Sequence, residues 1–198
     1  MHFSISILFC LLFSLSSFAQ SSWKKAYEKD QLVIYTRTTK TGLFEFKATQ
    51  VMPQPLKKVH AVIKDHASYP KWSYKTKSLE IIERISPDAH YAHTIVDFPF
   101  PMKDRDLVML SETTYPDSKT VLIQLEGKPK KIAKQEDFVR IETVQGYWRL
   151  TKLSDNKTEV IYQMASESVG LPNWLIETFA LEAPKQNMTK INERAGKL

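Results

Sequence analysis

The stretch that decides the fold is residues 97–110, "DFPFPMKDRDLVML", in which two Phe-Pro pairs precede a run of charges and then an apolar segment. Pro99 and Pro101 have no backbone N–H group to donate, so strand pairing must stop there. If this part of the chain is extended, Phe98 and Phe100 lie on the same side. The stretch therefore predicts a hinge that ends one strand, places aromatic side chains at an edge and begins the next strand.

Arg105 stands between two aspartates, Asp104 and Asp106, where the hinge becomes a strand. A guanidinium group can donate two parallel hydrogen bonds to one carboxylate. We therefore expect structural roles for Arg105 and Asp106, with contact to a ligand as the alternative for Arg105. We expect Arg105 to pair with a carboxylate, for which Asp97, across the hinge, is a candidate.

Outward from the hinge, apolar-rich segments alternate with turn signals. The stretches "SPDA", "YPDS" and "SDNK" are typical of turns between strands. The predicted strands are residues 31–40, 43–52, 78–85, 91–98, 106–115, 120–126, 138–153 and 159–168.

Three helices complete the prediction: residues 23–30, residues 56–66 and a long helix from Pro172 to the C-terminus. Apolar residues recur in the last one at near-helical intervals. The order of elements is that of an α+β protein, in which one antiparallel sheet covers its apolar face with the closing helix.

The length of 198 residues, with 42% hydrophobic content, fits a single domain. Residues 1–19 contain no Asp, Glu, Lys or Arg, and small residues precede Ala19. This pattern predicts a signal peptide cleaved near Ala19, with residues 20–198 as the mature domain; an uncleaved anchor is the alternative. The single cysteine, Cys10, would be removed, and a cysteine-free mature chain suits the bacterial periplasm.

The net charge of +6 remains on the mature domain and favours anionic surfaces. Four lysines gather in "KPKKIAK": Lys128, Lys130, Lys131 and Lys134. A lysine loop of this kind is usually just solvated, and that is our first interpretation; transient contact with an anionic membrane surface is the alternative. Export argues against nucleic acid as a partner, and we expect a monomer.

Three stretches resemble the START family of lipid-transfer domains: "FPFPMKDRDLV" (98–108), "GYWRL" (146–150) and "VGLPNWLIETFALEAPKQNMTKI" (169–191). The likeness covers Trp23 to the C-terminus, and the order of elements agrees with the helix-grip fold of that family. The resemblance implies a curved antiparallel sheet wrapped around the C-terminal helix, with a tunnel between them. It implies non-covalent binding, and transfer, of one lipid or other hydrophobic molecule, with no catalysis.

The resemblance also guides the choice of ligand-contacting side chains. Tyr162, Met164 and Ser166 share one strand face, a mixed lining that suits an apolar ligand with few polar anchors. Ordinary core packing is the alternative for any one of them. The residues expected at the ligand are Phe100, Met109, Trp148, Met164, Trp174, Leu175 and Phe179, the last three capping the tunnel from the closing helix.

The rival prediction is a cyclase- or hydrolase-like enzyme acting on an apolar substrate in the same cavity. The sequence has no Gly-x-Ser-x-Gly or His-Glu-x-x-His motif, and its five glycines form no phosphate-binding loop. His93 and Asp97 would share a strand face with Tyr91, which makes these three the acid/base set of the rival prediction.

The histidines do not favour a metal site. His90 and His93 fall on opposite faces of a strand, and His60 and His66 diverge on a helix. We therefore expect no metal and no cofactor.

Overall fold

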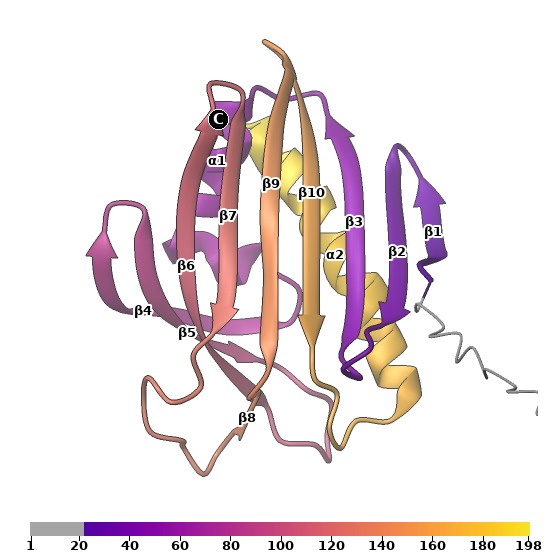
Figure 1. Ribbon diagram of the computed structural model, residues 1–198, viewed down its shortest axis with the longest axis vertical. Coiled ribbons are helices and arrows are strands. Elements are labelled where there is room, and N and C mark those ends of the chain that lie inside the picture. Colours follow the sequence, from indigo (N-terminus) through magenta and orange to yellow (C-terminus); the bar gives the residue numbers. More distant parts are fainter. Residues whose placement is uncertain (1–21) are drawn as a thin grey trace, which may run out of the picture.

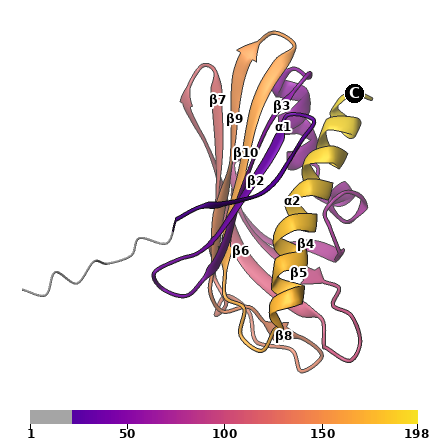
Figure 2. The same cartoon turned by 90° about the vertical axis from the view of Figure 1, so that its right-hand side faces the viewer.

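The computed structural model describes residues 22–198. The predicted signal peptide, its cleavage site near Ala19 and Cys10 lie outside this range. The described chain forms one large curved sheet, with its helices packed on the concave face (Figures 1 and 2). The α+β fold with a long C-terminal helix, predicted from the sequence, is confirmed.

The sheet has 10 strands in the order β1-β2-β3-β10-β9-β7-β6-β5-β4, with β8 paired to β6 beside this path. Neighbours along the path are antiparallel, and β8 is parallel to β6. The strands are β1 (Lys24–Lys29), β2 (Leu32–Thr38), β3 (Phe44–Met52), β4 (Thr76–Ser86), β5 (Ala89–Val96), β6 (Arg105–Asp117), β7 (Thr120–Gly127), β8 (Val139–Arg140), β9 (Val144–Ser154) and β10 (Lys157–Ser166).

Three helical elements complete the fold: α1 (Leu56–Lys64), the 3-10 helix η1 (His66–Lys71) and α2 (Asn173–Ala195). Helix α2 lies across the concave face of the sheet and buries one side of its length, including Leu175, Met188 and Ile191. Its buried Asn187 accepts a hydrogen bond from the backbone N–H of Tyr74 at 2.7 Å, which joins α2 to the segment before β4. Among the described residues, no helix is both long and apolar enough to cross a bilayer.

The core lies between the sheet and the helices and is centred on aromatic side chains. The rings of Trp148 and Tyr162, on neighbouring strands β9 and β10, stack with centroids 3.7 Å apart. Trp72 packs edge-on against Trp148, and Phe46 packs edge-on against Tyr162. This cluster fills the middle of the concave face and leaves space on either side of it.

The predicted helix over residues 23–30 is wrong, because this segment is the edge strand β1. Its Lys, Ala and Glu residues favour a helix by intrinsic propensity. Asp30 and Gln31 both have positive φ angles, of 51° and 63°, which is the backbone of a tight two-residue hairpin turn. The resulting pairing with β2 outweighs the weak helical preference.

Two other element boundaries also differ from the prediction. Residues 138–153 form two strands instead of one, because β8 leaves the path to pair with β6 while β9 pairs with β7 and β10. The helix predicted over 56–66 ends as α1 at Lys64 and continues after Asp65 as η1. The side chain of Asp65 caps η1 by accepting a hydrogen bond from Ser68 N–H.

Candidate ligand-binding site

A cavity of about 190 Å³ lies between α2 and the inner face of the sheet. Helix α2 contributes Ile176, Phe179, Ala180 and Ala183 to its wall. Across from the helix, the wall comes from β3, β6 and β10 and from the hinge. The remaining lining residues are Phe44, Phe46, Val96, Phe98, Arg105, Leu107, Ile141, Val144, Tyr162, Met164, Ser166, Glu167, Ser168 and Leu171. We call this space the α2 cavity.

A second cavity, of about 270 Å³, lies between α1, η1 and strands β4 to β7. We call it the α1 cavity. It is more polar, because three histidines, His60, His66 and His90, line it together with Ser111 and other hydroxyl groups. The resemblance implied one tunnel, whereas the structure has two separate cavities on the inner face.

The two cavities adjoin each other along the sheet. On β6, Leu107 lines the α2 cavity and Met109, the next residue on the same face, lines the α1 cavity. The stacked rings of Trp148 and Tyr162 stand at the same boundary, with Trp148 on the α1 side and Tyr162 on the α2 side. The aromatic stack is therefore the partition between the two spaces.

The structure divides the predicted ligand residues into three groups. Met164 and Phe179 line the α2 cavity, while Met109 and Trp148 line the α1 cavity. Leu175 is only 2% exposed and lines neither cavity.

Phe100 and Trp174 line neither cavity and lie on the surface, with 96% and 59% of their area exposed. The expectation that Phe98 and Phe100 share a side is wrong. The backbone N–H of Met102 donates to the Pro99 carbonyl at 3.0 Å, so the hinge is a turn and not an extended segment. The turn sends Phe98 inward and Phe100 outward.

Phe98 is the main lining residue missing from the sequence prediction. Its ring stacks on that of Phe179 with centroids 4.6 Å apart, and so joins the hinge to α2. Phe44, Phe46 and Leu107 were missed as well. The alternation of side chains along β3 and β6 carries the signal for these three, but it could be used only with the inward face of each strand known.

The predicted ion pair between Arg105 and Asp97 is wrong. Asp97 instead pairs with Lys75 at 3.1 Å and with Lys77 at 3.0 Å. Arg105 points to the inner face of the sheet, where its Nη2 donates to the carbonyl of Val169 at 3.0 Å. This bond holds the loop before α2 against the start of β6.

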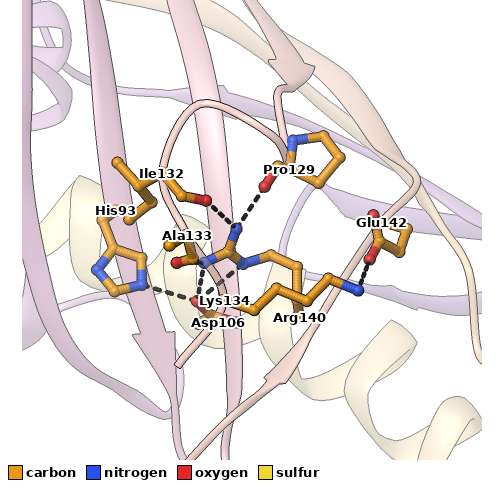
Figure 3. Close-up of polar contacts among 8 residues, drawn as sticks. All are labelled: His93, Asp106, Pro129, Ile132, Ala133, Lys134, Arg140 and Glu142. Carbon is orange, nitrogen blue, oxygen red and sulfur yellow. Dashed lines mark hydrogen bonds and ion pairs between the residues drawn. The ribbon is translucent and has the colours of Figure 1, made fainter. Parts of the chain in front are cut away.

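Asp106, by contrast, forms a buried charged cluster on the outer face, shown in Figure 3. Both Asp106 and Arg140 have side chains only 1% exposed, and Nη2 of Arg140 lies 2.7 Å from Oδ2 of Asp106. His93 Nε2 is 2.9 Å from the same oxygen. Burial works to raise the pKa of Asp106, but the hydrogen bonds from Arg140 and His93 outweigh it, so the pKa lies below its usual value.

The Asp106 cluster also holds the lysine loop. Arg140 donates to the backbone carbonyls of Pro129, Ile132 and Ala133, so one side chain fixes the course of the loop over the outer face (Figure 3). Three of its lysines are in ion pairs: Lys128 with Glu126, Lys131 with Glu83 and Lys134 with Glu142. Lys130 completes the predicted set and is exposed.

The predicted acid/base set does not face either inner cavity. His93 is bound to Asp106 on the outer face, and Asp97 is held by two lysines. Tyr91 lies under Lys131, whose Nζ is 4.1 Å from the ring centroid. None of His93, Asp97 and Tyr91 lines the α1 or α2 cavity.

His60 and His66, expected to diverge, both line the α1 cavity, whereas His90 and His93 lie on opposite faces of β5 as expected. The rings of His66 and His90 have centroids 4.4 Å apart. Burial, with help from His66 and Arg84, lowers the pKa of His90 to about 4, so this ring is neutral at pH 7. Within the described part of the chain, no three His, Cys, Asp or Glu side chains are placed to hold a metal ion.

A family model described as START domain matches residues 9–189. The match covers most of the chain, so the chain belongs to the START domain family, whose members generally bind lipids or other hydrophobic ligands. The uncharacterized protein PA1579 of Pseudomonas aeruginosa is 24% identical over 177 residues, which is 88% of this chain and 87% of that protein.

Solved structures share the fold. A STAR-related lipid transfer protein from Xanthomonas axonopodis (fragment 25–204) is 20% identical, with a TM-score of 0.79 over 88% of this chain and 98% of its own. Human STARD10 is also 20% identical, with a TM-score of 0.77 over 88% of this chain and 73% of its own. The Zhui aromatase/cyclase of a Streptomyces species is a more distant match, 14% identical with a TM-score of 0.53 over 78% of this chain and 93% of its own.

Replacing Asp106 by Asn tests the buried cluster, because it keeps the shape of the side chain but leaves the Arg140 charge buried without its partner. We expect the free energy of unfolding at pH 7 to fall by about 3–5 kcal/mol, measured by chemical denaturation. The pKa of Asp106 is lowered in the folded state, so its stabilising effect is present above the unfolded pKa of about 3.9 and is lost as pH falls. The difference between the two proteins should therefore shrink below about pH 4.

Asp155→Asn is the matched control, because Asp155 is exposed and pairs only with Lys152 on the surface. It should change the stability by less than about 1 kcal/mol. Equal effects of the two substitutions would contradict a special role for the buried cluster.

Proposed function

We propose that this chain is a non-enzymatic carrier that binds one hydrophobic molecule, a lipid, in the α2 cavity. The observation that carries the proposal is the cavity itself, an aromatic and aliphatic space between the sheet and α2. Ligand sites are typically concave and mostly apolar, with few polar groups that fix orientation. The α2 cavity has this character, with Arg105, Glu167 and two serines as its charged and hydroxyl-bearing side chains apart from Tyr162.

The rival prediction of cyclase- or hydrolase-like activity has no comparable support. Its three proposed acid/base residues face away from both inner cavities. The likeness to an aromatase/cyclase is at the level of the fold alone.

We further propose that the ligand enters and leaves at a membrane surface. Three large hydrophobic side chains, Phe100, Val169 and Trp174, are 96%, 74% and 59% exposed. They lie on the hinge and on the loop and first turn that begin α2, at the same end of the molecule (Figure 1). Exposed apolar side chains that gather in one place mark interaction sites, and Trp favours the membrane interface.

Phe98 of the hinge and Leu171 of the loop before α2 form part of the wall of the α2 cavity, so the cavity borders this end of the molecule. The lysine loop also lies at this end (Figure 1). We propose that its lysines add attraction to anionic lipids, although three of the four are in ion pairs. We retain export to the periplasm and a monomeric state as proposals, the first from the composition of residues 1–19.

Filling the cavity tests the binding proposal. Ala183 lies on the cavity side of α2, so Ala183→Phe would place a ring in the space that the ligand needs. We expect the affinity for the neutral probe Nile red, measured by its fluorescence, to fall by about tenfold or more. Thr189→Phe, on the exposed side of the same helix, is the control and should leave the affinity unchanged. Unaltered binding by Ala183→Phe would place the ligand elsewhere.

Replacing the exposed aromatics tests the membrane proposal. The double variant Phe100→Ser, Trp174→Ser should retain Nile red binding but transfer a fluorescent lipid between vesicles about tenfold more slowly, because apolar side chains no longer enter the interface. Leu153→Ser removes a similarly exposed side chain at the opposite end and serves as the control. Equal transfer rates for the double variant and the unaltered protein would refute entry at this end.

The same assay measures the lysine loop. Substituting Ser for Lys128, Lys130, Lys131 and Lys134 should slow transfer from anionic vesicles and leave transfer from neutral vesicles unchanged. A variant that transfers equally well from anionic vesicles would show that these lysines are only solvated or structural.

A further inference from the structure

The charged residues at the start of β6 are distributed unequally between the two faces of the sheet. Successive side chains of a strand point to opposite faces, so Asp106 lies on one side of the sheet and Arg105 lies on the other. Asp106 pairs with Arg140 at 2.7 Å on the outer side, and Asp104, which precedes β6, pairs with Lys77 at 2.7 Å. Arg105 is left on the inner side, in the wall of the α2 cavity, without either adjacent carboxylate.

Arg105 is almost fully buried there, with 6% of its area exposed. Its Nη2 donates to the Val169 carbonyl at 3.0 Å, while its buried Nε has no hydrogen-bond partner. No carboxylate among residues 22–198 lies within ion-pair distance of its guanidinium group. The face of Phe98 covers it, with a distance of 5.3 Å from Cζ to the ring centroid.

Glu167 is the acidic residue that also lines this cavity. Its Oε1 accepts a hydrogen bond from the backbone N–H of Glu142 at 2.7 Å, which holds the carboxylate toward that loop. Burial lowers the pKa of Arg105, and the nearby Glu167 charge opposes this effect only in part. Glu167 therefore moderates the positive charge at Arg105 without pairing with it.

A buried guanidinium group with unused donors is costly, because it has lost water without gaining an equivalent partner. The cost disappears if a ligand supplies the anion, and a planar guanidinium group is suited to carboxylate and phosphate oxygens. The rest of the α2 cavity is mostly aromatic and aliphatic. One end of the site thus favours an anion and the remainder favours hydrocarbon.

We propose that the α2 cavity selects a single-chain amphiphile with an anionic head, a carboxylate or a phosphate monoester, and that Arg105 binds this head. The cavity volume of about 190 Å³ lies below the roughly 300–1,000 Å³ of typical drug-sized sites, which favours one chain over the two chains of a phospholipid. The inference rests on the proposed carrier function and adds the chemistry of the ligand head and the residue that reads it.

Calorimetry at pH 8 with decanoate, decyl phosphate and decan-1-ol tests the assignment. The two anions are used below their critical micelle concentrations, and the alcohol below its solubility limit. Charge-assisted hydrogen bonds predict that the unaltered protein binds at least one of the two anions about ten- to a hundredfold more tightly than the alcohol. The comparison between decanoate and decyl phosphate identifies which oxyanion the site prefers. Equal affinities for the alcohol and both anions would overturn the assignment while leaving the carrier function intact. Failure to bind any of the three would count against both.

Arg105→Gln should remove the preference for the anion and leave decan-1-ol binding within about twofold. Arg149→Gln makes the same change of charge at an exposed position on β9 and should retain the preference.

If Arg105→Gln weakens binding of the alcohol and of the anions equally, Arg105 acts only by holding Val169, and the assignment is wrong. Loss of the preference in Arg84→Gln instead would place the head in the α1 cavity and would also overturn the assignment. The comparison of anion and alcohol in the unaltered protein remains decisive even if Arg105→Gln does not fold.

Discussion

The alternation of side chains at the start of β6 is the constraint on which the rest of the site depends. It directs Arg105, Leu107 and Met109 to the concave face, where they line the two cavities, and it directs Asp106 to the convex face. Because Asp106 is buried there, it requires a cation, and Arg140 supplies one from β8. The same pair fixes the loop that crosses the outer face, so a single strand organises both sides of the sheet.

On the concave side, the sheet must bury its apolar face against α2 and still leave room for a ligand. The stack of Trp148 on Tyr162 meets both requirements. The two large flat rings fill the centre of the concave face and leave a cavity on each side. The contact of Phe98 with Phe179 then joins the hinge to α2 at the edge of one cavity. The hinge and α2 are therefore in direct contact at the edge of the α2 cavity.

Much of the fold could be predicted from the sequence, because long segments with a clear period determine their own structure. The strand expected over 120–126 is β7, and the closing helix is α2. The errors fall where a short turn, or a contact between residues far apart in the sequence, determines the local structure. The left-handed backbone of Asp30 and Gln31 forms a hairpin turn, so the helix-forming segment before it becomes β1. The pairing of Arg140 with Asp106 holds β8 apart from β9.

The site was less predictable, since it depends on which face of each strand points inward. Met164 and Phe179 do line the α2 cavity, as does Phe98, which the prediction omitted, whereas Phe100 is exposed. The Phe-Pro repeat does not reveal that Met102 closes a turn onto Pro99. The hydrogen bond from Arg105 to the Val169 carbonyl was not predicted either, because it joins segments that are far apart in the sequence.

The central claim is that the space between α2 and the sheet holds one hydrophobic molecule. The most direct test is native mass spectrometry of residues 20–198 purified from the organism that makes the protein, followed by solvent extraction and identification of any bound compound. We predict one hydrophobic molecule per chain, lost in the Ala183→Phe variant. A chain that is reproducibly free of ligand, or one that carries the same compound after the cavity is filled, would contradict the claim.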